Sequence, residues 1–288
     1  MRFARVMLGY RWALLVLLAL GACTSLPTVA TDAQQPAAVV RLAGPRGPLT
    51  ASQSHAILAR LRNRSANSSI FDHHLAREEA IVGSPLTTGN TVKLLQDGPA
   101  TYQAMFEAIA AAKDHINMET YILEDDEVGH QFAQALIGKQ RKGVQVNIIR
   151  DGVGSFNTAP AFLKSWGDSG IRLLEFNPVN PLASRTDWEL NQRDHRKLLI
   201  VDGVTAFLGG INISNVYSGG SSHKKPAPTK ANAGLAWRDT DLQLRGPVVA
   251  ELQKLFLATW SKQNGPPLAA SNFFPAPGSP GTQLVRAI

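Results

Sequence analysis

Several side chains between residues 193 and 212 could together bind a phosphate group and attack it. His195 and Lys197 lie two residues apart at the start of an almost wholly apolar run, 197–202, and Gly209-Gly210-Ile211-Asn212 follows. Such a run predicts a strand buried on both faces, and its period of two places the imidazole and the ammonium on one face. An imidazole can attack phosphorus, while an ammonium and an amide N–H can bind its oxygens. We expect substrate to be bound by His195, Lys197, Gly210 and Asn212, with His195 as the nucleophile.

The wider pattern around this segment resembles a known family. The sequence reads His195-x-Lys197, four residues, Asp202, six residues and Gly-Gly-x-Asn, and residues 237–241 read Trp-Arg-Asp-Thr-Asp. This arrangement resembles the phospholipase D superfamily, whose histidine, lysine and aspartate form the HKD motif. From about residue 90 to residue 260 the chain is similar to the first half of a bacterial cardiolipin synthase.

The resemblance implies a fold and a partner. Members of the superfamily carry two HKD halves around a pseudo-twofold axis, and each half supplies one His, one Lys and one Asn to a shared site. This chain contains one HKD motif. We therefore expect an α/β fold, a phospholipase D-like layered sheet flanked by helices, that forms one half of this arrangement. The partner would be a second HKD half or a second copy of the chain in a homodimer.

The resemblance also assigns chemistry to the site. It implies a catalytic set of His195, Lys197, Asn212, Asp239 and Asp202. His195 would form a covalent phosphohistidine with no metal and no cofactor, and a second histidine would protonate the leaving oxygen because His195 cannot do both. Lys197 and Asn212 would hold the nonbridging oxygens in the transition state.

The acidic residues have different expected roles. Asp239 is expected to hydrogen-bond the other nitrogen of His195, as in the family, and Asp241 is the second choice. Asp202 names the motif, yet at the end of a buried strand it is expected mainly to support structure, by capping the turn at Gly203 or by pairing with an arginine. Glu119 could line the site or have a structural partner.

The N-terminus is predicted to be a bacterial lipoprotein signal peptide over residues 1–22. Three arginines precede a short apolar run, Trp12–Leu20, which is too short to span a bilayer, and small residues lead to Cys23. Cys23 is the only cysteine, so no internal disulfide can form, and its position matches a lipidation site rather than a buried core cysteine. Lipidation at Cys23 would anchor the protein in the bacterial cell envelope. Residue 24 is Thr rather than Asp. By resemblance to bacterial lipoproteins, this implies the periplasmic face of the outer membrane rather than retention at the inner membrane.

The net charge is compatible with two classes of partner. Removing the three arginines of the signal segment from the net +7 leaves +4 on the mature chain. A mildly basic surface suits anionic phospholipid as well as nucleic acid, and charge alone does not separate them. The resemblance favours an anionic or zwitterionic phospholipid substrate over nucleic acid.

Composition and periodicity divide the chain into five parts. Residues 23–50 are predicted to be the lipidated cysteine and a flexible tether, and 51–88 a helical extension. Residues 89–265 are predicted to be the catalytic domain. Residues 281–288 echo the glycine-led segment 89–95, so 266–288 are predicted to be a linker and the first strand of a missing second domain, left as an unpaired edge.

Within the catalytic domain, hydrophobic patterns alternate in α/β order. The predicted strands cover 91–95, 115–123, 144–150, 171–176, 197–202, 204–208 and 238–244, and the predicted helices cover 99–113, 127–142, 159–169 and 247–262. The strand that follows His195 is expected to be central. Two polar features are given structural interpretations: Asp72-His73-His74 as a helix start rather than a metal site, and 218–236 as a solvated loop rather than a head-group contact.

Three functions are compatible with these observations. The first is a phosphatidyltransferase of the cardiolipin synthase type, of which this chain is one half. The second is a small phosphodiesterase or nuclease in which two single-motif chains pair around a twofold axis. The third is an inactive, lipid-anchored binding protein.

Overall fold

The computed structural model describes residues 40–62, 75, 78, 81–180, 191–219 and 237–288. Contacts divide the chain into Met1–Ala38 and Val39–Ile288, and all described residues belong to the second unit. The predicted signal peptide and Cys23, the Asp72-His73-His74 segment and most of the predicted loop 218–236 lie outside the described residues. Within the described part, no helix is both long enough and apolar enough to cross a membrane.

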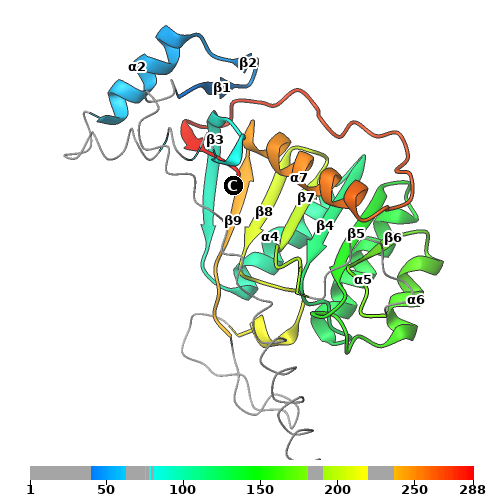
Figure 1. Ribbon diagram of the computed structural model, residues 1–288. Coiled ribbons are helices and arrows are strands. Elements are labelled where there is room, and N and C mark those ends of the chain that lie inside the picture. Colours follow the sequence, from blue (N-terminus) through cyan, green and yellow to red (C-terminus); the bar gives the residue numbers. More distant parts are fainter. Residues whose placement is uncertain (1–39, 63–74, 76–77, 79–80, 181–190, 220–236) are drawn as a thin grey trace, which may run out of the picture. The chain divides into compact units, whose positions relative to one another are not determined.

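A ten-stranded mixed sheet is the framework of this unit (Figure 1). The strand order is β2-β1-β3-β9-β8-β7-β4-β5-β6, with β10 also paired to β3, so the strand that follows His195 (β7) is central as predicted. The strands are β1 (Leu42–Gly44), β2 (Gly47–Pro48), β3 (Leu86–Leu95), β4 (His115–Thr120), β5 (Gln145–Asp151), β6 (Arg172–Phe176), β7 (Leu198–Val201), β8 (Thr205–Gly209), β9 (Asp241–Arg245) and β10 (Gln283–Val285). The helices are α2 (Ala51–Arg62), α4 (Gly98–Ala111), α5 (Glu127–Gln140), α6 (Pro160–Asp168), α7 (Val248–Lys262) and the short 3-10 helix η3 (Asn215–Tyr217).

The predicted α/β class is confirmed by two apolar cores on opposite faces of the sheet. One core packs α4, α5 and α6 against the sheet, and the other packs α7 against it. Strand β7 contributes to both, because Leu199 and Val201 face the first core while Leu198 and Ile200 face the second. Its continuous apolar run therefore reflects burial on both sides, and each fully buried aliphatic side chain contributes about 1.5–3 kcal/mol.

Asp202 ends β7 and holds the neighbouring strand β4 in place. Its carboxylate accepts hydrogen bonds from the backbone N–H groups of Lys113 (2.8 Å), Asp114 (2.8 Å) and His115 (3.0 Å) at the start of β4. Its backbone is left-handed, with φ of 53°. The predicted structural role of Asp202 is confirmed, but its predicted partners were wrong, since it binds three peptide groups rather than capping Gly203 or pairing with an arginine.

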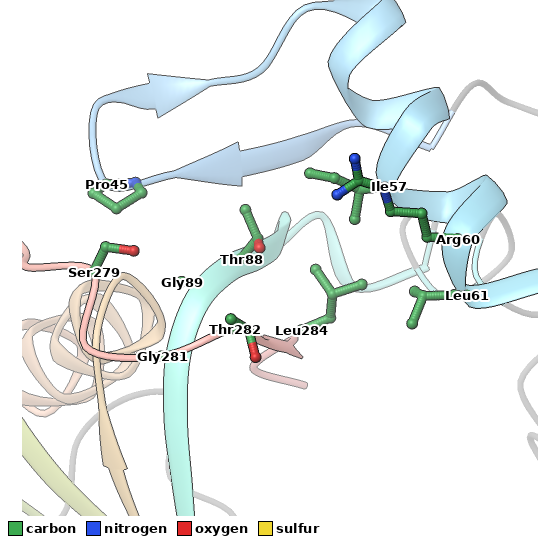
Figure 2. Close-up of a pocket in the computed structure, with 10 residues that line it drawn as sticks. All are labelled: Pro45, Ile57, Arg60, Leu61, Thr88, Gly89, Ser279, Gly281, Thr282 and Leu284. Atoms are coloured by element: carbon green, nitrogen blue, oxygen red, sulfur yellow. The ribbon is translucent and has the colours of Figure 1, made fainter. Parts of the chain in front are cut away.

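The segment before α2 is more structured than a tether. Residues 42–48 form β1 and β2, and Leu42 is buried beside Leu58 and Leu86 in a third apolar cluster. The prediction of a flexible tether is wrong here because β1 pairs with β3, a contact over forty residues away in sequence that local composition does not reveal. A cavity of about 680 Å³ lies beside it, and Figure 2 shows Ile57 and Leu61 of α2 on one side and Thr88 and Leu284 on the other.

The C-terminal segment folds back onto the sheet. Its backbone is held by Asp114, which accepts from Asn272 N (2.9 Å), and by Gln145, which accepts from Ala269 N (2.7 Å). Strand β10 then pairs antiparallel with the first part of β3, the strand whose sequence it echoes. The predicted unpaired edge is therefore wrong. Assignment of this strand to a second domain stays a prediction.

We predict that Asp202→Ala lowers the free energy of unfolding by at least about 2 kcal/mol, because three N–H groups lose a charged acceptor and alanine disfavours the left-handed backbone. Urea unfolding of the full chain measures this difference. Asp202→Asn is the matched control, since asparagine tolerates the left-handed conformation and keeps one acceptor oxygen, and it should lose less. Equal stability of the alanine variant and the wild type would contradict the structural role.

Candidate active site

The predicted site residues meet at one edge of the sheet, namely the edge formed by the ends of the neighbouring strands β4, β7, β8 and β9. Strand β4 runs antiparallel to β7, with Glu119 opposite Leu198, so the chain leaving β4 lies beside the chain entering β7. Strand β8 ends and β9 begins at the same edge, where Gly209 pairs with Asp241. The edge therefore collects His195, Lys197, Gly210, Asn212, Asp239 and Asp241. Asp202 is the exception, because it lies at the opposite end of β7, and its place in the catalytic set is wrong.

His195 and Lys197 both contact one aromatic ring, that of Tyr121. The imidazole of His195 and the ring of Tyr121 have centroids 4.7 Å apart at an interplanar angle of 59°. The ammonium of Lys197 lies 5.3 Å from the centroid of the same ring and donates a hydrogen bond of 2.6 Å to the His195 carbonyl. His195 is exposed, whereas Lys197 is buried. The nucleophile candidate is thus accessible and has a buried cation beside it.

Lys197 is held in an acidic environment without an ion pair. Burial lowers the pKa of Lys197, while the nearby carboxylates of Asp194, Asp239, Asp241 and Asp151 act in the opposite direction. Among the described residues none of these carboxylates is within ion-pair distance of its ammonium, whose hydrogen bond goes to a carbonyl instead. The charge can therefore interact with an incoming anion.

Asn212 connects two of the chain segments at this edge. Its Oδ1 accepts a hydrogen bond from Ile122 N (2.9 Å), and its Nδ2 donates to the hydroxyl of Tyr217 (2.8 Å). The side chain is buried. One of its two amide N–H groups is thus already used within the protein, and Asn212 fixes the chain directly after Tyr121. Its contact with substrate oxygens stays a prediction.

The two glycines at the end of β8 make room for two carboxylates. A Cβ on Gly209 would lie 2.1 Å from Asp241 Oδ1, and a Cβ on Gly210 would lie 2.7 Å from Asp239 Cγ. Asp241 is buried and accepts from Ile211 N (3.1 Å), and burial raises its pKa to about 6. Close packing by carboxylates therefore explains this glycine pair.

The prediction that the Asp239 carboxylate accepts a hydrogen bond from His195 is wrong, because this bond is absent among the described residues. Within the described residues the Asp239 carboxylate packs on Gly210 and makes no hydrogen bond to the imidazole. The physical reason is the strand order: β8 lies between β7 and β9, so the segments that enter β7 and β9 are about 10 Å apart.

The residues on either side of His195 are anchored to buried partners. Asp194 N donates to Asp151 Oδ2 (2.9 Å), and the Asp194 carboxylate accepts from Arg196 Nε (3.0 Å). Arg196 Nη2 also lies 2.8 Å from Glu119 Oε1, at angles outside hydrogen-bond geometry, and it donates to Thr259 Oγ1 (2.7 Å). Sequence reasoning assigned no role to Asp194 or Arg196, although they flank the histidine.

Protonation is divided unequally within this group. Burial, and after it the neighbouring Asp194, raise the pKa of Glu119 to about 10 against the pull of Arg196. Burial acts to raise the pKa of Asp194 as well, but hydrogen bonds with Glu119 and Arg196 outweigh it and hold that pKa below its usual value. Near neutral pH Glu119 is therefore the neutral acid, and Asp194 is the anion that balances Arg196.

An open pocket of about 600 Å³ lies on the α7 side of His195. Its walls combine apolar, neutral polar and cationic side chains with one carboxylate, namely Phe176, Gln192, Arg193, Asp194, His195, Arg196, Leu255, Ala258, Thr259 and Lys262. In the described part of the chain no cluster of three or more histidine, cysteine, aspartate or glutamate side chains could hold a metal ion.

Comparison with known proteins gives the family. The family model described as "Cardiolipin synthase, PLD-like domain" matches residues 105–219. This chain contains a phospholipase D-like domain. It is 36% identical over 183 residues to a cardiolipin synthase of Alkalihalophilus pseudofirmus, which covers 63% of this chain and 34% of that protein. It is also 36% identical over 200 residues to cardiolipin synthase A of Pseudomonas putida, covering 67% of this chain and 38% of that protein.

Part of the chain is also similar to solved structures. The phospholipase D family member Nuc of Salmonella typhimurium superposes with a TM-score of 0.41 at 21% identity, covering 60% of this chain and 95% of Nuc. The chain spans little more than a third of the length of the two cardiolipin synthases above.

We predict that Glu119→Gln gains stability relative to the wild type as pH rises. The folded-state pKa of Glu119 is above its unfolded value, so the stability that its bound proton contributes is complete below a pH of about 4.5 and is lost as pH rises towards about 10. Glutamine keeps the neutral shape and does not titrate. The difference in unfolding free energy between variant and wild type should therefore shift towards the variant from about pH 6 to about pH 9.

Urea unfolding across this pH range measures the shift, and Glu107→Gln, on the exposed side of α4, is the control for loss of one carboxylate elsewhere. A difference that stays constant with pH would show that Glu119 is not protonated in the folded state.

Proposed function

We propose that this chain catalyses phosphodiester transfer on membrane phospholipid, as one half of a phosphatidyltransferase of the cardiolipin synthase type. The observation that carries the proposal is the exposed imidazole of His195 beside the buried ammonium of Lys197, which has no ion pair within the described residues, inside the segment that matches the PLD-like domain. Cardiolipin synthase relatives support the class of reaction and a phospholipid substrate.

The proposed reaction has two displacements. A nitrogen of His195 attacks phosphorus, the bond from phosphorus to the first alcohol oxygen breaks, and that alcohol leaves after it receives a proton. An incoming alcohol then attacks the phosphohistidine, loses its proton, and restores the free imidazole. Lys197 supports both steps, since a fixed positive charge lowers the energy of the charged transition state.

The proton for the leaving alcohol is proposed to come from a second HKD half. Among the described residues, the other histidines are His55 on α2, His115 at the start of β4 and His130 on α5, and none of them contacts His195. The short span relative to the cardiolipin synthases is compatible with a second half in a longer protein.

A homodimeric, single-motif phosphodiesterase is the second candidate. An unpaired terminal strand would have argued against it, but β10 is paired to β3, so that objection does not hold. In this alternative a second copy supplies the second histidine around a twofold axis.

A membrane location completes the proposal. Lipidation of Cys23 would hold the site near phospholipid head groups, at the periplasmic face of the bacterial outer membrane. Labelling of cells with a palmitate analogue tests this, since Cys23→Ser should abolish incorporation.

We predict that His195→Ala lowers phosphatidyl transfer and bis(p-nitrophenyl) phosphate cleavage by at least about a thousandfold, because the nucleophile is lost. The full chain is assayed in detergent, and His55→Ala, an exposed histidine on α2, is the matched control that should keep full activity. Solution mass is measured on the same samples.

The solution mass and the activity together distinguish the two candidate functions. Activity that depends on His195 and belongs to a dimer supports the two-copy phosphodiesterase. A folded chain that is active only when a separate second half is added supports the half-enzyme. A folded chain that stays inactive in both cases would overturn the proposed function and leave an inactive, lipid-anchored protein.

A further inference from the structure

We propose that Tyr121 is a positioning residue that sets the geometry between His195 and Lys197. The inference rests on the proposed function of these two side chains. Neither the HKD pattern nor the match to the PLD-like domain assigns a role to this tyrosine.

The ring of Tyr121 contacts both members of the pair. Its centroid lies 4.7 Å from the imidazole centroid of His195, inside the range of favourable aromatic pairs of about 4.5–7 Å. The ammonium of Lys197 lies 5.3 Å from the same centroid, inside the limit of about 6 Å for a cation over an aromatic face. One rigid group therefore limits the movement of an exposed imidazole and of a lysine that, in the described part of the chain, has no carboxylate within ion-pair distance.

The position of Tyr121 is itself fixed on three sides. Its carbonyl accepts a hydrogen bond from Ser155 Oγ (3.0 Å), and the next peptide N–H, that of Ile122, donates to Asn212 (2.9 Å). Gly154 packs so closely that a Cβ there would lie 2.2 Å from the Tyr121 carbonyl oxygen and 2.8 Å from its Cδ2. Gly154 therefore blocks movement of the ring towards it, and the two hydrogen bonds fix the backbone from which the ring extends.

The ring carries this role rather than the hydroxyl. Both contacts are made to the aromatic ring, and within the described residues the Tyr121 hydroxyl has no hydrogen bond. Phenylalanine should therefore replace tyrosine, whereas leucine, which has a similar apolar character and no π face, should not. This pair of variants separates a positioning ring from a general packing requirement.

The test compares Tyr121→Phe and Tyr121→Leu in the full chain. The second HKD half is added in every assay if the wild type needs it for activity. Tyr121→Phe should keep kcat and KM for bis(p-nitrophenyl) phosphate within about twofold. Tyr121→Leu should lower kcat/KM about tenfold, the size expected when an aromatic pair and a cation–π contact are lost. Both parameters should change, kcat through His195 and KM through Lys197. Phe274→Leu, a half-exposed aromatic residue of the C-terminal segment, is the control.

A second measurement does not depend on activity. The side-chain NMR signal of His195 in histidine-labelled protein should move towards that of free histidine in Tyr121→Leu and stay in place in Tyr121→Phe. If the wild type is inactive but the signal behaves in this way, the proposed function fails and the positioning role stands.

Two results would overturn the inference. The first is a folded Tyr121→Leu variant with unchanged kcat, KM and His195 signal. The second is a Tyr121→Phe variant as impaired as Tyr121→Leu, which would move the role from the ring to the hydroxyl.

Discussion

The site depends on the buried charge group that anchors residues 194–197, because these residues precede β7 and have no strand pairing of their own. Arg196 lies between Glu119 of β4 and the Asp194 carboxylate, and it reaches Thr259 of α7. Such a group is costly to desolvate, so it persists only when its charges balance. One proton on Glu119 supplies the balance, since two carboxylates with one guanidinium would otherwise leave a buried negative charge. The backbone on both sides of His195 is thereby fixed while its imidazole stays exposed.

Strand β4 makes this arrangement possible by having two different faces. Ile116 and Met118 face the core under α4 and α5, whereas His115, Asn117 and Glu119 face the α7 side and are buried there. The apolar face supplies stability, and the polar face supplies the partners for Arg196 at one end and the contact with Phe273 at the other. Because β4 is buried on both faces and paired on both edges, its end is a rigid point from which Tyr121 extends. Rigid support of this kind is what a preformed phosphate site requires.

Sequence reasoning was most accurate where local pattern decides structure. The predicted strands 144–150 and 197–202 and the predicted helix 99–113 lie within two residues of the observed bounds of β5, β7 and α4. It failed where distant segments decide. The pairing of β1 and β10 with β3 depends on contacts that no local window contains, and the Asp239 assignment ignored the strand that separates β9 from β7. His195 and Lys197 could be predicted as neighbours because they are two residues apart in one extended segment. Tyr121 is distant in sequence, and only the antiparallel pairing of β4 with β7 brings it beside them.

Under the proposed function, the surroundings of His195 determine from which side the histidine of a second half can approach the substrate. One side of the His195 imidazole is occupied by Tyr121, and its main chain is tied down through Lys197, Asp194 and Arg196. The described side chains that contact or directly flank it are the Tyr121 ring, the Lys197 ammonium and the paired Asp194 and Arg196, and the neutral acid Glu119 is buried beside Arg196. A general acid must reach the leaving oxygen directly, which places it within hydrogen-bond distance of the substrate. It must therefore arrive across the exposed side of His195, and the same opening that admits the substrate has to admit the second histidine.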